Sequence, residues 1–424
     1  MLPITLIREK ADFVKERLAL KNFDASKIID RILEHDIERR ALQTRLDGVL
    51  AESNKLSKEI GALYRDGKRA EADIIKGKTV GLKDQSKLLE DKMKETEQLL
   101  EDELVQLPNI PHNCVPTGNT DNDNVVIKET GEKPNLTDDA VPHWDLLEKY
   151  KLMSLEYGNK ITGAGFPVFY GKGAKLQRAL VAFFLDRAVE AGYTEYIPPL
   201  MVNKASAFGT GSLPDKEGQM YYVDEDDLYL IPTAEVPITN ILRNELVKED
   251  DLPIKMTGHS QCFRREAGSY GKDVRGLNRV HQFEKVEIVQ FAHPDKSYEV
   301  LNEMMEYVSD LLSALGLPYR VLRLCGGDIT FASALTYDFE VFSAGQNRWL
   351  EVSSVSNFEV FQSNRLKTRF KDKASGKTKL VHTLNGSAMA LPRIIAALLE
   401  NNQTPEGIVI PDVLRPYMGC DMIK

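Results

Sequence analysis

Residues 261–287, QCFRREAGSYGKDVRGLNRVHQFEKVE, combine two strand-like ends with a loop rich in glycine and basic residues. Alternate residues of a strand face the same way, so we expect Arg264 to project together with Glu266, and Phe283 with Glu287. The loop contains Gly268, Gly271, Lys272, Arg275 and Gly276. This pattern predicts a strand–loop–strand unit with a cationic tip that faces a polyanion. The alternative is an ordinary hairpin with weak surface ion pairs.

Around this stretch, from about Val141 to the C-terminus, amphipathic periodicity is mixed with β-rich runs. Helices are predicted over residues 174–191 and 296–315, because apolar residues recur there every three to four positions. Strands are predicted at residues 280–291, 335–342 and 349–355. This mixture predicts an α+β fold with an antiparallel sheet.

The first hundred residues repeat apolar positions at alternating steps of four and three, which is typical of coiled coils. One series runs from Leu42 to Leu63 and continues backward through Arg39, His35, Ile32 and Ile28, and a second runs from Ile75 to Leu107. Between them lies the break Arg65-Asp66-Gly67-Lys68. We therefore predict two antiparallel helices over about residues 27–105, forming a hairpin about 55 Å long at 1.5 Å rise per residue.

Three prolines, Pro108, Pro111 and Pro116, end the second predicted helix. Residues 117–139, TGNTDNDNVVIKETGEKPNLTDD, then have the composition of a turn-rich connection. We expect an N-terminal domain over residues 1–115, a linker over 116–140 and a second domain over 141–424.

The composition excludes several classes of protein. The chain has 424 residues, of which 42% are hydrophobic and 28% charged, so a folded protein of at least two domains is expected. No apolar run approaches the roughly 18 residues of a membrane span and the N-terminus lacks a signal-peptide pattern, so we expect a cytoplasmic protein with no membrane partner. The four cysteines form no C-x-x-C pair, so no zinc is expected. No glycine-rich phosphate loop is found.

A second informative segment is residues 383–393, TLNGSAMALPR, which precedes the helical sequence IIAALLENN. Pro392 suits the first turn of a helix, where its missing N–H costs nothing. Arg393 would oppose the helix dipole there, so we expect an anion or a π-face beside it. The alternative is an arginine that simply extends into solvent.

These segments resemble the three signatures of class II aminoacyl-tRNA synthetases, and most closely those of the seryl-tRNA synthetase family. The first signature is similar to residues 192–201, the second to 263–287 and the third to 385–393. Three pieces are typical of the seryl family: Thr233-Ala234-Glu235, Glu351-Val352-Ser353-Ser354 and the TLNGS opening of the third signature. The resemblance covers the whole chain, since that family also has an antiparallel coiled-coil arm. It implies such an arm followed by a catalytic domain with an antiparallel β-sheet flanked by helices.

The resemblance implies a serine–tRNA ligase reaction: ATP and L-serine form seryl-adenylate, and serine is then transferred to the 3′ end of serine tRNA. Selenocysteine tRNA is allowed as a second substrate. Such catalysis is positioning plus charge stabilisation, without a protein nucleophile. Arg264, Glu351 and Arg393 would be catalytic, with Arg264 holding the α-phosphate. The implied ATP-binding set is Arg264, Arg265, Glu266, Val280, His281, Gln282, Phe283, Glu351, Val352, Ser353, Ser354 and Arg393.

Within this implied set, Phe283 and Arg393 would sandwich the adenine ring, and Glu266 would meet its amino edge. Glu351 and Ser354 match positions for Mg²⁺ bound through ATP. His281 is also conceivable as a general base, but a packing or orienting histidine is favoured. The sequence departs from the seryl pattern in two places. These are Arg265, and Ala388 together with Leu391-Pro392. Both departures affect the shape of the pocket rather than the class of reaction.

The residues implied to bind serine are Thr233, Ala234, Glu235, Glu287 and Ser387. A polar pocket of this kind can reject alanine, which would leave buried partners without a hydrogen bond. Glu287 follows Phe283 by four strand residues, or roughly 13 Å. That distance is about what an adenylate spans between its base and its aminoacyl group, and it supports the assignment independently of the resemblance.

The predicted hairpin is locally basic on a chain of net charge −9. Its distal part carries Lys55, Lys58, Arg65, Lys68, Arg69, Lys76, Lys78 and Lys83 against Glu59, Asp66, Glu71 and Asp73. Such a patch can follow an RNA backbone. The resemblance implies the long variable arm of serine tRNA as its target, reached across a homodimer, whereas a solvated face with balanced ion pairs is the alternative. A second basic run, from Arg365 to Lys379, is a weaker candidate for contact with the acceptor stem.

Two other kinds of function remain open from the sequence. One is a class II relative that uses threonine or proline, or that loads serine onto a carrier protein; the basic arm argues against the carrier. The other is an inactive adaptor, against which the presence of Arg264, Glu351 and Arg393 counts.

Overall fold

The computed structural model describes residues 1–136, 140–215, 218–266 and 275–424. The chain forms two compact units. One contains residues 2–19 and 23–108, and the other contains Met1, residues 20–22 and residues 109–424. The main boundary therefore falls at Pro108, one of the prolines expected to end the second long helix.

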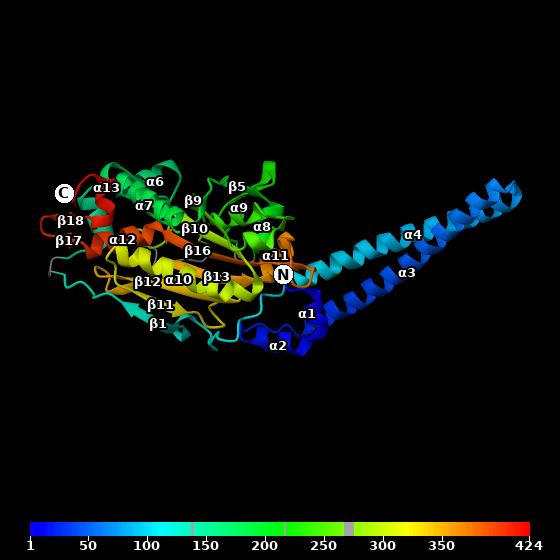
Figure 1. Cartoon of the computed structure of the whole chain (residues 1–424). Coiled ribbons are helices and arrows are strands. Elements are labelled where there is room, and N and C mark those ends of the chain that lie inside the picture. The colour runs from blue at the N-terminus through cyan, green and yellow to red at the C-terminus, as the bar shows by residue number, and fades with distance from the viewer. Residues whose placement is uncertain (137–139, 216–217, 267–274) are drawn as a thin grey trace. The chain divides into compact units, whose positions relative to one another are not determined.

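The first unit consists of helices. Short helices α1 (Ile4–Glu9) and α2 (Ala11–Ala19) precede the long helices α3 (Ser26–Arg65) and α4 (Arg69–Leu104). Figure 1 shows α3 and α4 running side by side as a hairpin, in blue and light blue. Leu42, Leu89 and Met93 are buried between them. The predicted hairpin and its turn are thus confirmed.

At the base of α3 the apolar stripe differs from the prediction by one residue. Ile29, Ile32 and Asp36 are buried there, rather than Ile28 and His35. The reason is that α1 and α2 pack against α3 and turn its buried face toward themselves. Asp36 accepts hydrogen bonds from Arg8, Arg39 and Arg40. Burial opposes ionisation of Asp36, but the hydrogen bonds from Arg8 and Arg39 outweigh it and lower the pKa.

The second unit is built on an eight-stranded sheet in the order β1-β11-β12-β13-β16-β10-β9-β4. The strands are β1 (Val125–Thr130), β4 (Thr194–Glu195), β9 (Ile254–Phe263), β10 (Gln282–Ala292), β11 (Tyr319–Arg323), β12 (Leu335–Ser343), β13 (Arg348–Glu359) and β16 (His382–Ala390). All neighbours are antiparallel except β4 and β9, which are parallel. The predicted α+β class, antiparallel sheet and central strands are confirmed.

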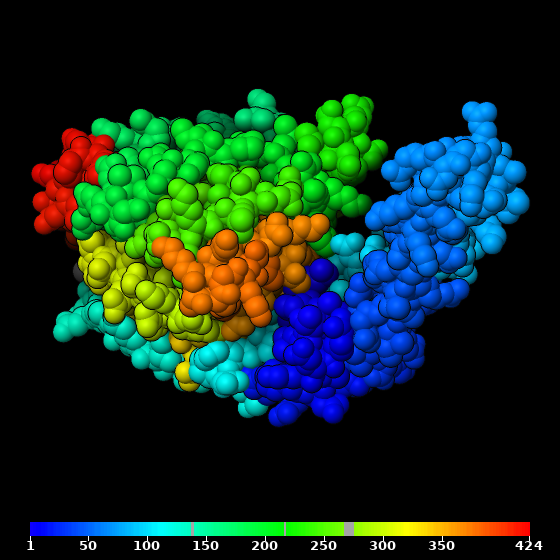
Figure 2. All heavy atoms as spheres, turned by 45° about the vertical axis from the view of Figure 1, so that its right-hand side comes forward, coloured from blue at the N-terminus to red at the C-terminus, as the bar shows by residue number. Residues whose placement is uncertain are grey.

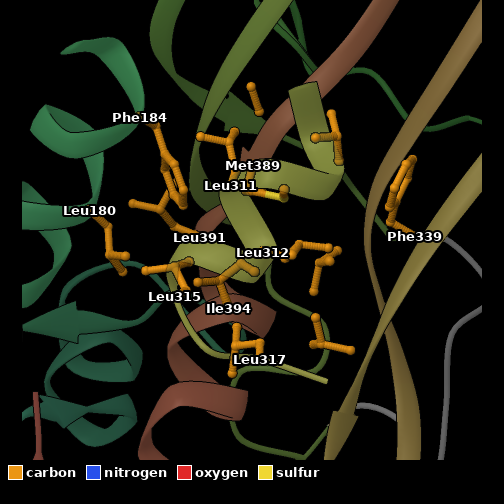
Figure 3. Close-up of a cluster of buried hydrophobic side chains, with 14 of the residues drawn as sticks. Leu180, Phe184, Leu311, Leu312, Leu315, Leu317, Phe339, Met389, Leu391 and Ile394 are labelled. Atoms are coloured by element: carbon orange, nitrogen blue, oxygen red, sulfur yellow. The ribbon is translucent and has the colours of Figure 1, made fainter. Parts of the chain in front are cut away.

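Three helices, α7 (Gly171–Glu190), α10 (Ser297–Ala314) and α12 (Leu391–Asn401), pack on this sheet. Figure 3 shows the core that they share, with Leu180 and Phe184 of α7, Leu311, Leu312 and Leu315 of α10, Leu391 and Ile394 of α12, and Phe339 of β12. The apolar residues of α10 recur at helical spacing, which gives it one buried face. The core thus holds α12, and with it Arg393, against the sheet.

Smaller elements complete the unit. The helices are α5 (His143–Lys149), α6 (Leu155–Ile161), α8 (Lys204–Thr210), α9 (Glu235–Asn240), α11 (Val360–Leu366) and α13 (Arg415–Met418). The short strands are β2 (Met153–Ser154), β3 (Val168–Phe169), β5 (Met201–Asn203), β6 (Tyr222–Val223), β7 (Leu228–Leu230), β8 (Leu246–Val247), β14 (Arg369–Lys371), β15 (Thr378–Leu380), β17 (Gln403–Thr404), β18 (Gly407–Val409) and β19 (Met422–Ile423). Figure 2 shows the orange segment of α11 to β15 beside the light-green segment, in accord with the pairing of β14 and β8.

The linker prediction differs from the structure. Residues 125–130, expected in a turn-rich connection, form β1 and pair with β11 at the edge of the sheet. Val, Ile and Thr favour a strand and the charged residues Lys128 and Glu129 suit its exposed edge, but the turn residues around this segment concealed the signal. None of the helices in the described ranges is both long and apolar enough to cross a bilayer.

Candidate active site

A cavity of about 650 Å³ opens where β10, β13 and β16 meet the first turn of α12. Most of the predicted site residues line it: Thr233, Glu235, Arg264, Glu266, Val280, Phe283, Glu287, Glu351, Val352, Ser353, Ser354, Ser387 and Arg393. These residues come from segments up to 160 positions apart, because the antiparallel sheet brings its central strands together. A second cavity, of about 440 Å³, shares only Phe283 with this set and adds Gln282.

One wall of the cavity is a face of β10. Phe283, Lys285 and Glu287 all line it, whereas Glu284 lines only the second cavity, which Phe283 also borders. The alternation predicted for Phe283 and Glu287 is therefore confirmed. The pairing of β10 with β9 runs without a shift from Gln282 to Phe291, which keeps this face regular.

Glu287 lies at the buried end of this wall, with 1% of its surface exposed. Its carboxylate is 2.5 Å from the ammonium of Lys285 and accepts hydrogen bonds from Thr233 Oγ1 at 3.1 Å and Asn385 Nδ2 at 3.3 Å. Burial raises the pKa of Glu287, while Lys285 and Thr233 act in the opposite direction.

A second carboxylate, Glu235, begins α9 beside Glu287. Gln362 Nε2 donates to Glu235 Oε1 at 2.7 Å and also to the carbonyl of Thr210 at 3.1 Å. Burial and the negative charge of Glu287 raise the pKa of Glu235 to about 7. Two carboxylates thus share one end of the cavity with a single ammonium group, that of Lys285.

At the other end, aromatic and guanidinium groups gather. The Arg264 guanidinium lies over the ring of Phe283, 5.3 Å from its centroid. Arg393 donates from Nε to the carbonyl of Asn278 at 3.1 Å and from an η nitrogen to the carbonyl of Glu351 at 2.8 Å. Arg393 therefore faces the cavity with its plane fixed, and the alternative of an arginine extended into solvent is wrong.

The comparisons with known proteins agree with this geometry. Residues 1–111 match the model of the seryl-tRNA synthetase N-terminal domain, and residues 221–402 match that of the class II tRNA synthetase core domain (G, H, P, S and T). The chain is 51% identical to the serine–tRNA ligase of Salinibacter ruber, over 99% of this chain and 98% of the relative.

The chain belongs to the seryl-tRNA synthetase family. The crystal structure of seryl-tRNA synthetase from Pyrococcus horikoshii complexed with ATP is 36% identical, with a TM-score of 0.91 over 100% of this chain and 99% of that one. The cytoplasmic enzyme of Naegleria fowleri, in complex with AMP, is 29% identical with a TM-score of 0.86 over the same shares.

One strand prediction is wrong. Strand β9 ends at Phe263, so Arg264 and Glu266 do not project from a strand. Glu266 has a left-handed backbone, with φ of 47°, and its carboxylate is 3.1 Å from Arg279. The chain turns away from the sheet there, which a pattern of alternating residue types does not reveal. Both side chains nevertheless reach the cavity. Gly268, Gly271 and Lys272 lie outside the described residues.

Four predicted site residues do not line the cavity: Ala234, Arg265, His281 and Gln282. Ala234 is fully buried behind Thr233 and Glu235, and Arg265 is exposed. The ring of His281 stacks on Phe166 at 5.3 Å, and its Nδ1 lies 3.0 Å from the carbonyl of Arg264. These contacts support a packing and orienting role for His281. Gln282 lines the second cavity.

Several residues of the cavity were missed from the sequence. Lys285 follows Phe283 by two positions and Asn385 opens the third signature, so alternation and proximity could have found both. Asn278 carries no such signal, because a loop brings it in, and neither does Gln362, which lies behind the cavity against Glu235. The same holds for Asp338, which lies opposite Ser354 in the pairing of β12 with β13 and accepts a hydrogen bond from its hydroxyl.

Oxygen ligands suited to a hard cation gather around Ser354. Glu351 and Ser354 both line the cavity, and Asp338 is hydrogen-bonded to Ser354. Burial and the negative charge of Glu351 raise the pKa of Asp338. A carboxylate and a hydroxyl beside a phosphate site are the donors that Mg²⁺ takes, together with phosphate oxygens. The residues therefore fit the metal that the family pattern implies.

A different cluster, Glu249, His293 and Asp372, is the one group of metal-ligand type found among the described residues. The ammonium of Lys379 is already 2.9 Å from Asp372 Oδ1. The backbone N–H of Asp295 donates to His293 Nδ1, which assigns the ring proton of a neutral His293 to Nε2, the atom that faces both carboxylates. Asp372 is thus already paired with Lys379, while His293 Nε2 lies 3.9 Å from each carboxylate.

The two basic segments differ in their exposure. All eight basic residues of the distal arm are exposed. In the second run, Arg365 is buried, stacks against Phe208 and Phe361, and donates to the carbonyls of Phe208 and Leu213. The hypothesis that Arg365 contacts the acceptor stem is therefore wrong, because α11 turns this side chain into the interior.

The proximity of Glu235 and Glu287 predicts a pKa that can be measured. We expect Glu235 to titrate near pH 7, and Glu287→Gln to lower that pKa because it removes a nearby negative charge. The pKa in the folded chain lies above the ordinary 4.5, so the contribution of Glu235 to stability falls as pH rises from 4.5 to about 7. Carboxyl-carbon NMR with Glu235→Gln for assignment measures this. A Glu235 pKa near 4.5 with and without Glu287 would contradict the coupling.

Proposed function

We propose that this protein uses its cavity as a serine–tRNA ligase of the cytoplasm. It activates L-serine with ATP to seryl-adenylate and transfers serine to the 3′ end of serine tRNA. The observation that carries the proposal is the face of β10. Phe283 at one end, Lys285 in the middle and Glu287 at the buried end line one cavity. Their spacing along the strand, roughly 13 Å between first and last, fits an adenylate.

For the nucleotide, we propose that adenine takes the face of Phe283 that the guanidinium of Arg264 now covers at 5.3 Å. Arg393 would close the other face of the ring, because its plane is already fixed by the carbonyls of Asn278 and Glu351. Arg264 would then meet the α-phosphate. There it would stabilise the charge that builds up as the serine carboxylate attacks phosphorus and pyrophosphate leaves.

For the amino acid, the two carboxylates provide acceptors for the serine ammonium and hydroxyl groups. Glu287 is already oriented by Thr233 and Asn385, and Glu235 by Gln362. Alanine would leave this buried site without the hydrogen bond that the serine hydroxyl makes and is therefore disfavoured. Exclusion of threonine depends on size, and Ser387 and Thr233 are the small residues that line this end.

We propose Glu351 and Ser354 as the protein ligands of Mg²⁺ bound with ATP. When present, the ion neutralises charge on the phosphate oxygens. The chain's own contribution is orientation. The Ser354 hydroxyl donates a hydrogen bond to Asp338, so its oxygen lone pairs stay available for a cation.

The test is serine-dependent exchange between ATP and pyrophosphate. We expect exchange with serine, and Glu287→Gln to lower kcat/KM for serine on the order of 10- to 100-fold, since a hydrogen bond from a charged buried group is lost. Glu284→Gln is the matched control, because Glu284 lies on the same strand but faces the other cavity. Its exchange should equal that of the unaltered protein.

Three outcomes would contradict the proposal. Exchange with threonine or proline but not serine would reassign the substrate. An absence of exchange with every amino acid would favour an adaptor. An equal loss of kcat/KM for serine in Glu287→Gln and Glu284→Gln would show that Glu287 has no specific role in binding serine.

We further propose that the distal arm binds the long variable arm of serine tRNA. The support is the surplus of exposed basic residues between Lys55 and Lys83, of which Lys68 alone has an acidic partner, 4.0 Å away, among the described ion pairs. Phosphates can be contacted by such side chains with little reading of bases.

Reversing four of these charges, in Lys55→Glu, Lys58→Glu, Lys76→Glu and Lys78→Glu together, should raise KM for tRNA about tenfold or more. Serine activation should be unchanged. The control is reversal of Lys87, Lys92 and Lys94, exposed residues nearer the base of α4. An equal effect in both variants, measured by aminoacylation at fixed salt, would contradict a distal site.

We also propose that the protein is a homodimer through the face around β4. Ile197, just beyond this last strand of the sheet, is 92% exposed, which is unusual for isoleucine. We expect sedimentation to show a dimer that Ile197→Asp weakens, whereas Ile74→Asp on the arm, 68% exposed, should leave it intact. A monomeric unaltered protein, or equal weakening by both variants, would contradict this interface.

A further inference from the structure

A buried histidine–carboxylate pair lies outside the cavity. His143, at the start of α5, and Glu400, in the last turn of α12, are both fully buried. Their nearest atoms, His143 Nδ1 and Glu400 Oε1, are 2.7 Å apart. Helix α12 also carries Arg393 in its first turn, so the pair sits at one end of the helix that serves the adenine site at the other.

Glu400 accepts an unusual number of hydrogen bonds. The donors are the backbone N–H and ring Nδ1 of His143, the side chains of Ser343 and Gln346, and the backbone N–H of Gly345. Burial alone would oppose ionisation, but the hydrogen bonds from His143 and Ser343 outweigh it and lower the pKa of Glu400. An ionised, fully buried carboxylate thus fixes the ring of His143.

The orientation of that ring determines its second contact. Because Nδ1 donates to Glu400, Nε2 of the neutral ring is an acceptor. The backbone N–H of Leu277 donates to Nε2 at 2.9 Å. The preceding residue, Gly276, has φ of +65°, and a Cβ there would lie 2.3 Å from Nε2. Glycine is therefore required for this close approach.

Leu277 and the next residue connect the pair to the cavity. Both Leu277 and Asn278 line it, and the carbonyl of Asn278 accepts from Arg393 Nε at 3.1 Å. The amide of Asn278 donates to Gln346 Oε1 at 2.9 Å, and Gln346 donates in turn to Glu400 at 3.1 Å. Two hydrogen-bonded routes, through His143 and through Gln346, thus lead from Glu400 to the residues that orient Arg393.

We propose that His143 and Glu400 are positioning residues for the nucleotide: they fix Leu277 and Asn278, and thereby the guanidinium plane of Arg393 that closes the adenine site. This inference rests on the ATP site proposed above. The inference predicts different effects on ATP and on serine, because Thr233, Glu235 and Glu287 have no described hydrogen bond to this network. Loss of the network should weaken ATP binding and leave serine binding nearly unchanged.

Two matched substitutions test the role of the ring. In His143→Asn, the short amide can replace Nδ1 and keep the donor to Glu400, but the Leu277 N–H loses its acceptor. In His143→Gln, the longer amide can replace Nε2 and keep that acceptor. We expect His143→Asn to raise the Kd of ATP about tenfold, the effect of leaving a buried N–H without an acceptor. His143→Gln should restore most of the affinity.

The measurements are calorimetric titration with ATP, KM for serine in pyrophosphate exchange, and the thermal midpoint of each full-length variant. Gln346→Met cuts the second route and should weaken ATP binding in the same direction. The control is His382→Phe, which removes a hydrogen bond of 2.7 Å between the Nδ1 of a partly buried ring and Ser297, away from the cavity. It should lower the thermal midpoint without changing ATP affinity.

Two results would overturn the inference. One is a lower thermal midpoint in His143→Asn and Gln346→Met with ATP affinity unchanged, which would make the network structural only. The other is an equal loss for ATP and serine. Failure of the proposed function is a different result: the unaltered protein would bind ATP but show no serine-dependent exchange. In that case the ATP titrations would still decide the role of His143.

Discussion

The pairing of β10 between β9 and β16 is the constraint on which the site depends. Side chains alternate along a strand, so the register decides that Phe283, Lys285 and Glu287 face the cavity and Glu284 faces away. A shift of one residue would exchange the two sets. Opposite Glu287 lies Gly258, where a Cβ would be 2.6 Å from the carbonyl of Tyr196 and 2.8 Å from Ile238. A glycine at this point of β9 lets α9 pack closely, and α9 begins with Glu235.

Buried charge gives the two ends of the cavity different chemistry. Glu235 and Glu287 lie near one ammonium, that of Lys285, and the raised pKa of each carboxyl reflects the cost of burial. A substrate with an ammonium group would supply the positive charge that this end lacks. The other end is cationic and aromatic, as a phosphate and a purine require. This difference supports the proposal that the cavity takes an amino acid at one end and a nucleotide at the other.

Much of this arrangement could be predicted from the sequence. Periodicity identified the hairpin, α7, α10 and the central strands, because their apolar positions repeat at fixed intervals. Alternation placed Phe283 and Glu287 together. What it could not supply was the course of irregular backbone: the left-handed turn at Glu266, the edge strand β1 within a turn-rich segment and the buried turn of α11 that removes Arg365 from the surface. His143 and Glu400 were also missed, since only the fold brings together residues 257 positions apart.

The most direct test of this account is a crystal structure with a non-hydrolysable analogue of seryl-adenylate. The account predicts adenine between Phe283 and the guanidinium of Arg393, the phosphate group at Arg264, and the seryl group within hydrogen-bond distance of Glu287. An analogue bound with its base away from Phe283, or with its seryl group remote from both Glu235 and Glu287, would contradict the account.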